Sequence, residues 1–200
     1  MKPSTPPKVF GAAILLMVLF VWFRGCNSQE PLERALSLGD TQGAAKILKA
    51  HPSLANKPLR FGHMTPVFFA TMCGNSKENI DLLITNGADI NARSGGFNLT
   101  PLQEAVWSAK VGAVNALLAH NPDVNALNPD NQTAMHYAIS VYMNDVFSKS
   151  SNNAGKEIME SLLAHGANIN LGTPILTAAS HYANNTDLIE FLLSKGANPE

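Results

Sequence analysis

Apolar residues recur through the second half of each repeated segment of this chain at helical spacing. Leucine, isoleucine and valine stand three and four positions apart in four stretches, which places them on one face of a helix. The stretches are residues 80–84, 114–118, 158–163 and 188–193. Gly87, Gly166 and Gly196 follow three of them, where a left-handed residue commonly ends a helix. The pattern predicts four short helices, each with one buried stripe.

A recurring tetrapeptide precedes each of these stretches and predicts a further helix. Its copies begin at Thr65, Thr100, Thr133 and Thr173, separated by 35, 33 and 40 residues. Threonine is a good N-cap because its hydroxyl accepts an orphan amide of the first turn, and the proline that follows three of the four threonines needs no amide partner there. The chain is therefore predicted to consist of helix pairs, which must stack because no single pair can bury both faces.

These signatures resemble those of a known repeat family. The tetrapeptides Thr-Pro-Val-Phe and Thr-Pro-Leu-Gln, with Gly-Ala-Asp-Ile-Asn-Ala at residues 87–92, resemble the TPLH and GADVNA signatures of ankyrin repeats, whose period is about 33 residues. The resemblance covers residues 31–200 and implies an all-α solenoid of about five stacked helix pairs. Residues 31–38 and 41–50 lack the Thr-Pro signature and are predicted to form an N-terminal capping repeat.

One repeat is irregular. Thr133 and Gly166 are 33 residues apart, whereas Thr65 and Gly87 are 22 apart, so about eleven residues are inserted between the two helices of the third signature repeat. Residues 142–155 are polar and lack periodicity, and we expect them to form an exposed loop. An insertion of this kind is either part of a working face or a tolerated surface addition.

The N-terminal segment differs from the rest of the chain. Lys2 and Lys8 precede the uninterrupted apolar stretch Val9–Phe23, an order typical of an export signal. Residues 1–26 are therefore predicted to be either an uncleaved membrane anchor or a lipoprotein signal, with Cys26 as the lipidated residue. Both alternatives place residues 31–200 on the extracytoplasmic side of a bacterial membrane, in the periplasm, with residues 27–30 as a short tether.

Charge and candidate chemistry narrow the function classes. The net charge is −1 and no Lys/Arg cluster occurs, which argues against nucleic acid as a partner. The only cysteines are Cys26 and Cys73, so a disulfide framework is excluded, and Cys73 is expected to pack as a small apolar side chain. No nucleophile stands near a periodic His/Asp pair, and His136 takes the place of the structural histidine of the ankyrin tetrapeptide. We therefore expect no enzyme, no metal and no cofactor.

The resemblance implies that a protein partner binds the concave face of the first helices and the finger tips between repeats. Several residues at these positions are apolar, which is unexpected for a soluble repeat array. They form either an exposed protein interface or, alternatively, a core onto which the fingers fold. The predicted partner-binding residues are Phe61, Met64, Met72, Arg93, Phe97, Leu99, Trp107, Ser108, Leu127, Asp130, Gln132, Val141 and His181.

Two functions fit a small binding stack with an export segment and no catalytic constellation. The first is an immunity protein that neutralises a secreted toxin, such as a type VI-like effector with lipase activity. The second is a helper or scaffold for a resident periplasmic enzyme such as a catalase. The likeness of periplasmic ankyrin proteins to this chain is a fold-level analogy, and the sequence does not choose between the two.

Overall fold

The computed structural model describes residues 31–60, 62, 64–73, 76–148, 153–172 and 186–198. In these residues the regular structure is helical, and its β structure is a single bridge between Ser94 and Leu99. The predicted all-α fold is confirmed. The predicted signal or anchor (1–26) and tether (27–30) lie outside the described residues. No helix of the described part is long and apolar enough to span a bilayer.

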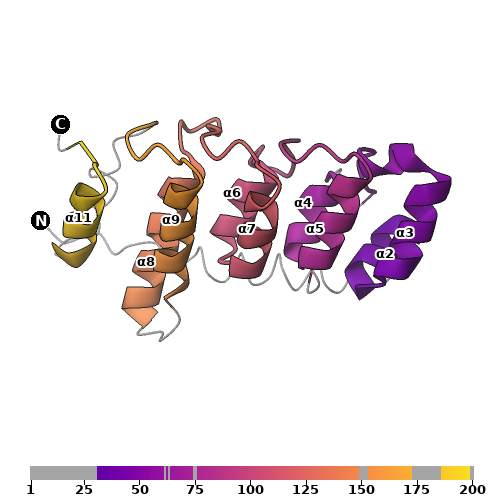
Figure 1. Ribbon diagram of the computed structural model, residues 1–200, viewed down its shortest axis with the longest axis horizontal. Coiled ribbons are helices and arrows are strands. Elements are labelled where there is room, and N and C mark those ends of the chain that lie inside the picture. The colour runs from indigo at the N-terminus through magenta and orange to yellow at the C-terminus, as the bar shows by residue number, and fades with distance from the viewer. Residues whose placement is uncertain are drawn as a thin grey trace, which may run out of the picture.

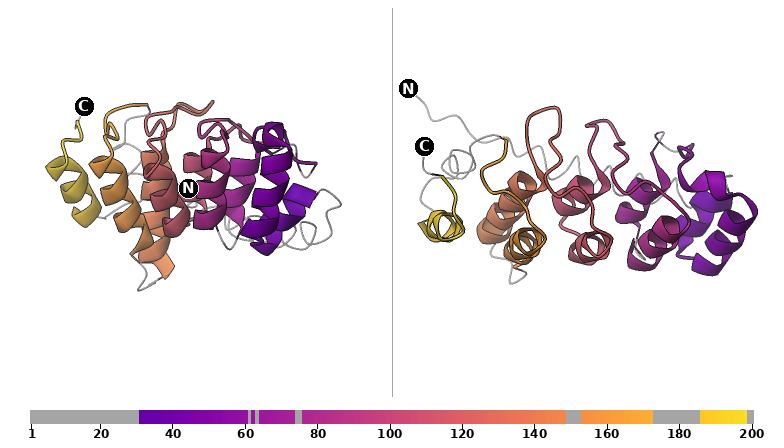
Figure 2. Two further views of the ribbon diagram at one scale, coloured as in Figure 1. Left: turned by 45° about the vertical axis from the view of Figure 1, so that its right-hand side comes forward. Right: turned by 45° about the horizontal axis from the view of Figure 1, so that its top comes forward.

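The helices form pairs that stand side by side in one row (Figure 1). In chain order they are α2 (Pro31–Leu38), α3 (Thr41–Ala50), the 3-10 helix η1 (Pro52–Ala55), α4 (Pro66–Met72), α5 (Ser76–Thr85), α6 (Pro101–Trp107), α7 (Val111–Leu118), α8 (Ala134–Ser148), α9 (Ala154–Ala164) and α11 (Thr186–Ser194). The first helices α2, α4, α6 and α8 contact one another in succession, as do the second helices α3, α5, α7 and α9. The fold therefore has two helical layers, and the turns between pairs project along one edge of the row (Figure 2).

The predicted apolar stripes lie between the layers. Ile80, Leu117 and Ile158 are fully buried in a core cluster that extends from Leu32 in α2 to Ala197 beyond α11. Each pair contributes one section of this core, so neighbouring pairs stabilise one another. The helices predicted at 31–38 and 41–50 have those bounds in the structure.

The predicted helix ends are confirmed in part. Gly87, Gly166 and Gly196 have φ of 83°, 85° and 90°, the left-handed conformation that a residue without a Cβ adopts easily. Thr100 caps α6 through a reciprocal pair of hydrogen bonds with Gln103. The same role was wrong for Thr65, whose hydroxyl makes no cap hydrogen bond.

Asparagine side chains join consecutive repeats. In each link the asparagine Nδ2 donates a hydrogen bond to the carbonyl of the glycine that ends the next repeat. The asparagine Oδ1 accepts a hydrogen bond from the backbone N–H two residues after that glycine. The links are Asn56 to Gly87 and Asp89, Asn125 to Gly166 and Asn168, and Asn170 to Gly196 and Asn198. These bonds supply a polar connection between repeats beside the apolar core.

The insertion in the third signature repeat is not the exposed loop predicted for residues 142–155. Helix α8 has 15 residues where α6 has 7, because the added residues continue the helix to Ser148. Met143 is 2% exposed and packs in the core, and Asp145 Oδ2 accepts a hydrogen bond of 3.0 Å from the N–H of Gly155 at the start of α9. The extension thus packs against the next helix and caps it. Residues 149–152 lie outside the described residues.

Candidate partner-binding surface

A hairpin between the second and third described helix pairs shapes the candidate surface. Ser94 and Leu99 exchange backbone hydrogen bonds of 2.9 and 3.1 Å, and Gly95 closes the turn with a φ of 73°. The hairpin folds back onto α4, since a Cβ on Gly95 would lie 3.0 Å from Phe68 Cζ. Phe97 is left near the tip with 57% of its surface exposed.

Three aromatic side chains form a row on the first-helix layer. The Phe97 and Trp107 ring centroids are 5.1 Å apart in an edge-to-face arrangement, and those of Trp107 and Tyr137 are 6.1 Å apart with the rings stacked at 27°. Asn128 fixes the far end of the row by donating a 2.7 Å hydrogen bond to the Tyr137 hydroxyl. The aromatic row therefore connects the hairpin, α6 and α8 across two repeats.

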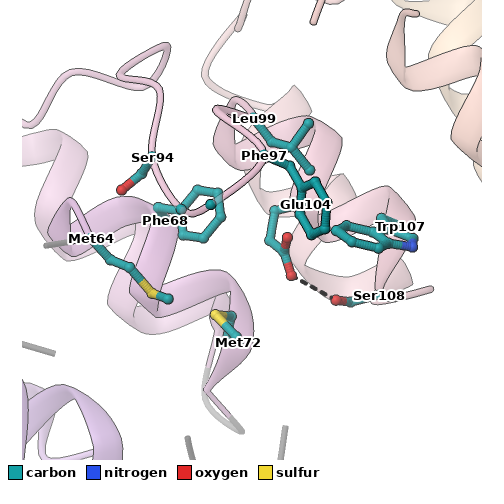
Figure 3. A pocket seen from close by; sticks show the side chains of 11 residues that line it. Met64, Phe68, Met72, Ser94, Phe97, Leu99, Glu104, Trp107 and Ser108 are labelled. Carbon is teal, nitrogen blue, oxygen red and sulfur yellow. Dashed lines mark hydrogen bonds between the residues drawn. The ribbon is translucent and has the colours of Figure 1, made fainter. Parts of the chain in front are cut away.

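Next to the aromatic row is a hollow of about 40 Å³ between α4 and α6. Phe68 and Met72 of α4 stand on one side, and Phe97 and Trp107 stand on the other (Figure 3). Its walls are otherwise small or apolar except for three polar side chains, Ser94, Glu104 and Ser108. We call this the Glu104 hollow, because Glu104 is the one ionisable residue among those that line it.

Glu104 is a carboxyl group held in apolar surroundings. It is 8% exposed, and its carboxyl lies between the side chains of α4 and the Phe97–Trp107 pair (Figure 3). Ser108 donates a 2.9 Å hydrogen bond to Oε1. Burial raises the pKa of Glu104, an effect that the Ser108 hydrogen bond partly offsets. Burial also raises the pKa of Tyr137. The hydrogen bond from Asn128 lowers this pKa, whereas the negative charges of Asp130 and Glu104 raise it further.

The predicted contact residues divide into an accessible group and a buried group. Met72, Phe97, Trp107 and Ser108 are brought together at the Glu104 hollow and retain accessible surface. The predicted exposure was wrong for three others, since Met64, Leu99 and Val141 are 4%, 1% and 5% exposed. One part of the apolar set is therefore core, while another part remains accessible. Whether the accessible group binds a partner stays a prediction.

Several of the predicted finger-tip residues form hydrogen bonds within the protein. Arg93 donates to the Asn98 carbonyl at 3.2 Å and to the Leu127 carbonyl of the next finger, so it links two fingers. Gln132 is half-buried, and its backbone bonds to Asn128 and to Gln103. Asp130 is exposed. Phe61 and His181 lie outside the described residues.

Potential reactive groups also have structural surroundings. The Nδ1 of His136 accepts a 3.0 Å hydrogen bond from the backbone N–H of Thr133, which confirms the structural bonding predicted for it. The Nε2 of His120, in the turn after α7, lies 2.8 Å from Asp81 Oδ1 of α5. Cys73 is buried, as predicted, and its thiol donates a hydrogen bond of 3.4 Å to the Phe69 carbonyl. In the described part of the chain, no group of three or more His, Cys, Asp or Glu side chains could hold a metal ion.

Sequence reasoning missed two residues of the surface, Phe68 and Glu104. Phe68 is the fourth residue of the first tetrapeptide, and Glu104 stands one helical turn before Ser108. The four-residue spacing of Glu104 and Ser108 places both on one helix face, and this spacing was the available signal. The sequence offered no comparable indication that the hairpin lies against Phe68.

Comparisons with known proteins agree with the two-layer repeat architecture. The profile of the family described as ankyrin repeats (three copies) matches residues 67–146 and, in an overlapping match, residues 107–200. An ankyrin repeat protein of fowlpox virus (strain NVSL) is 36% identical over 77 residues, which are 38% of this chain and 22% of that protein. The match therefore spans only a minor part of that relative's length.

Proposed function

Because this chain belongs to the ankyrin-repeat family, we propose that it is a membrane-tethered protein-binding module that neutralises a secreted toxin. Ankyrin repeats generally serve as non-catalytic scaffolds for protein–protein interaction. The proposed contact surface is the aromatic row with the adjoining Glu104 hollow, on the layer formed by α4, α6 and α8.

The aromatic row is the observation that carries the binding proposal. Partly exposed, well-packed aromatic side chains supply large contact area at little entropic cost, and they dominate the energy of many protein interfaces. Phe97 is 57% exposed, and its contact with Trp107 preorganises both rings. Removing the Trp107 side chain is expected to weaken partner binding by about 2 kcal/mol or more.

The N-terminal sequence supports the location that we propose. Lys2 and Lys8 ahead of the apolar stretch Val9–Phe23 fit an export segment whose basic end stays in the cytoplasm. The repeat stack then stands in the periplasm, held by this segment or by a lipid on Cys26. A tethered inhibitor is well placed against a toxin that damages membranes, such as a type VI-like effector with lipase activity, and inhibition by occlusion needs no chemistry of its own.

The test uses the full chain with a C-terminal affinity tag in a bacterial host. Captured partners are identified by mass spectrometry, and each is then exported to the periplasm with and without this chain while growth is recorded. We expect a partner that stops growth unless the chain is present. Trp107→Ala should lose the protection, whereas Leu38→Ala, which removes another exposed apolar side chain, should retain it.

Other outcomes of the same experiment refute the immunity role. Capture of a harmless resident enzyme, such as a catalase whose activity falls when the chain is deleted, supports the helper role instead. A fusion of alkaline phosphatase to the C-terminus tests the location, since the enzyme is active only after export. Metabolic labelling with a fatty acid tests the two forms of tether, because only a lipoprotein takes up the label and Cys26→Ser abolishes that uptake.

A further inference from the structure

The charges of the repeat stack are unevenly distributed. Residues 61–200 contain six lysines and arginines and twelve aspartates and glutamates. The first helices α4, α6 and α8 include Glu104 and Asp145 but no lysine or arginine. Asp145 is engaged at the start of α9. These three helices therefore carry only negative charge, and their other carboxyl group, that of Glu104, stands in the Glu104 hollow.

Within the described residues, the protein satisfies only part of the hydrogen-bonding capacity of this carboxyl group. Ser108 is its hydrogen-bond donor, and it bonds to Oε1. That bond leaves Oε2 available, and Oε2 is not fully closed off from solvent. Glu104 is only 8% exposed, so its carboxylate has lost much of its hydration, and a single hydroxyl replaces it poorly.

The walls of the hollow suit one type of incoming group. Phe68, Met72, Phe97 and Trp107 offer apolar surface to a methylene stem, while the aromatic rings also favour a cationic head. The indole nitrogen of Trp107 lies on the side away from Glu104 (Figure 3), so the wall that faces the carboxyl is hydrocarbon. An anionic group would be repelled by Glu104, and a purely apolar group would leave its charge unpaired.

We propose that the Glu104 hollow receives a lysine or arginine side chain of the protein partner, with the basic group paired to the Glu104 carboxylate. The stem of that side chain packs between Met72 and Phe97, and the ion pair is shielded from water by the aromatic row. This assignment rests on the proposed protein-binding function and specifies the chemistry of the partner: a basic anchor residue on a surface complementary to the acidic residues 61–200.

A pair of small probes tests the assignment without knowledge of the partner. n-Butylguanidinium reproduces an arginine side chain, and n-butylurea is its uncharged isostere. Trp107 is one of two tryptophans, so the full chain with Trp22→Phe reports on the hollow through Trp107 fluorescence. We expect saturable binding of n-butylguanidinium that is about ten-fold tighter than that of n-butylurea, because a charge-assisted hydrogen bond to a shielded carboxylate is added.

Three variants make the result specific. Glu104→Gln keeps the shape and should remove the preference for the cation, whereas Glu78→Gln, on the exposed surface of α5, should leave it unchanged. Phe97→Ala should weaken both probes together and preserve their ratio. Equal binding of the two probes, no saturable binding of either, or a preference that survives Glu104→Gln would each overturn the assignment.

The assignment and the proposed function fail in different experiments. If n-butylguanidinium binds as expected but no captured partner is toxic, the immunity role is wrong and the basic-anchor site stands. If a toxin is captured and Glu104→Gln protects cells as well as the parent chain does, the immunity role stands and the basic-anchor site is wrong.

Discussion

Two glycines in matched positions provide a sharp test of the corrected third signature repeat. Gly112 is the second residue of α7, and Gly155 is the second residue of α9. A Cβ built on Gly112 meets no other atom within 4 Å, whereas a Cβ on Gly155 would lie 2.2 Å from both the backbone N and the Cα of Tyr142. The difference arises because the extension of α8 passes directly against the start of α9.

The two alanine substitutions should therefore change stability in opposite directions. Gly112→Ala should stabilise the fold by about 0.5–1 kcal/mol, because alanine loses less backbone entropy than glycine in a helix. Gly155→Ala gains the same entropy term but must displace backbone, and overpacking of this kind costs roughly 1–3 kcal/mol. The entropy term is common to both variants, so they should differ by the overpacking cost of roughly 1–3 kcal/mol, which leaves Gly155→Ala with a net loss of up to about 2 kcal/mol.

Urea unfolding of the full chain, followed by far-ultraviolet circular dichroism, measures both changes. The comparison is between midpoints at equal slope, because a change in slope would report altered exposure on unfolding instead of altered stability. Equal stabilisation by the two alanines would refute the reasoning. It would mean that residues 142–148 do not run beside α9 and that the exposed loop predicted from the sequence is correct.

Three further substitutions test other features of the structure. Asn125→Ala removes the hydrogen bonds to Gly166 and Asn168, of 3.1 and 2.7 Å, and should cost about 1–2 kcal/mol. Hydrogen exchange should accelerate in α9, which ends at these bonds, and not in α2. Uniform acceleration would contradict a local link. Glu104→Gln should raise the melting temperature at neutral pH, because burial raises the pKa of Glu104. The native state therefore binds this proton more readily than the unfolded state, and it loses stability as the pH rises from about the ordinary pKa of 4.5. The gain in melting temperature should shrink at lower pH, and a gain that is independent of pH would count against this cause. Burial raises the pKa of Tyr137 above the ordinary value of 10.0. Tyr137→Phe should therefore remove the step at highest pH from the ultraviolet titration of the tyrosines. An unchanged titration would show that this step belongs to another tyrosine.

The features that sequence alone determined are local ones. The helices at 31–38 and 41–50 follow from apolar spacing around the turn at Gly39 and Asp40, because a helix is specified by residues within a few positions of one another. Gly87, Gly166 and Gly196 mark helix ends for a similarly local reason. The repeated tetrapeptides then require stacking, since each pair is too small to bury its own apolar surface.

Tertiary contacts decided the rest. The hairpin that ends at Leu99 lies against Phe68 of α4. Met64 and Leu99 are 4% and 1% exposed, whereas Phe97 near the hairpin tip is 57% exposed, although apolarity alone does not distinguish these residues. The polar insertion became helix because Met143 reaches the core and Asp145 caps α9. Burial, charge pairing and the Glu104 hollow depend on segments far apart in the chain, and for that reason periodicity predicted the stack but not the details of its surface.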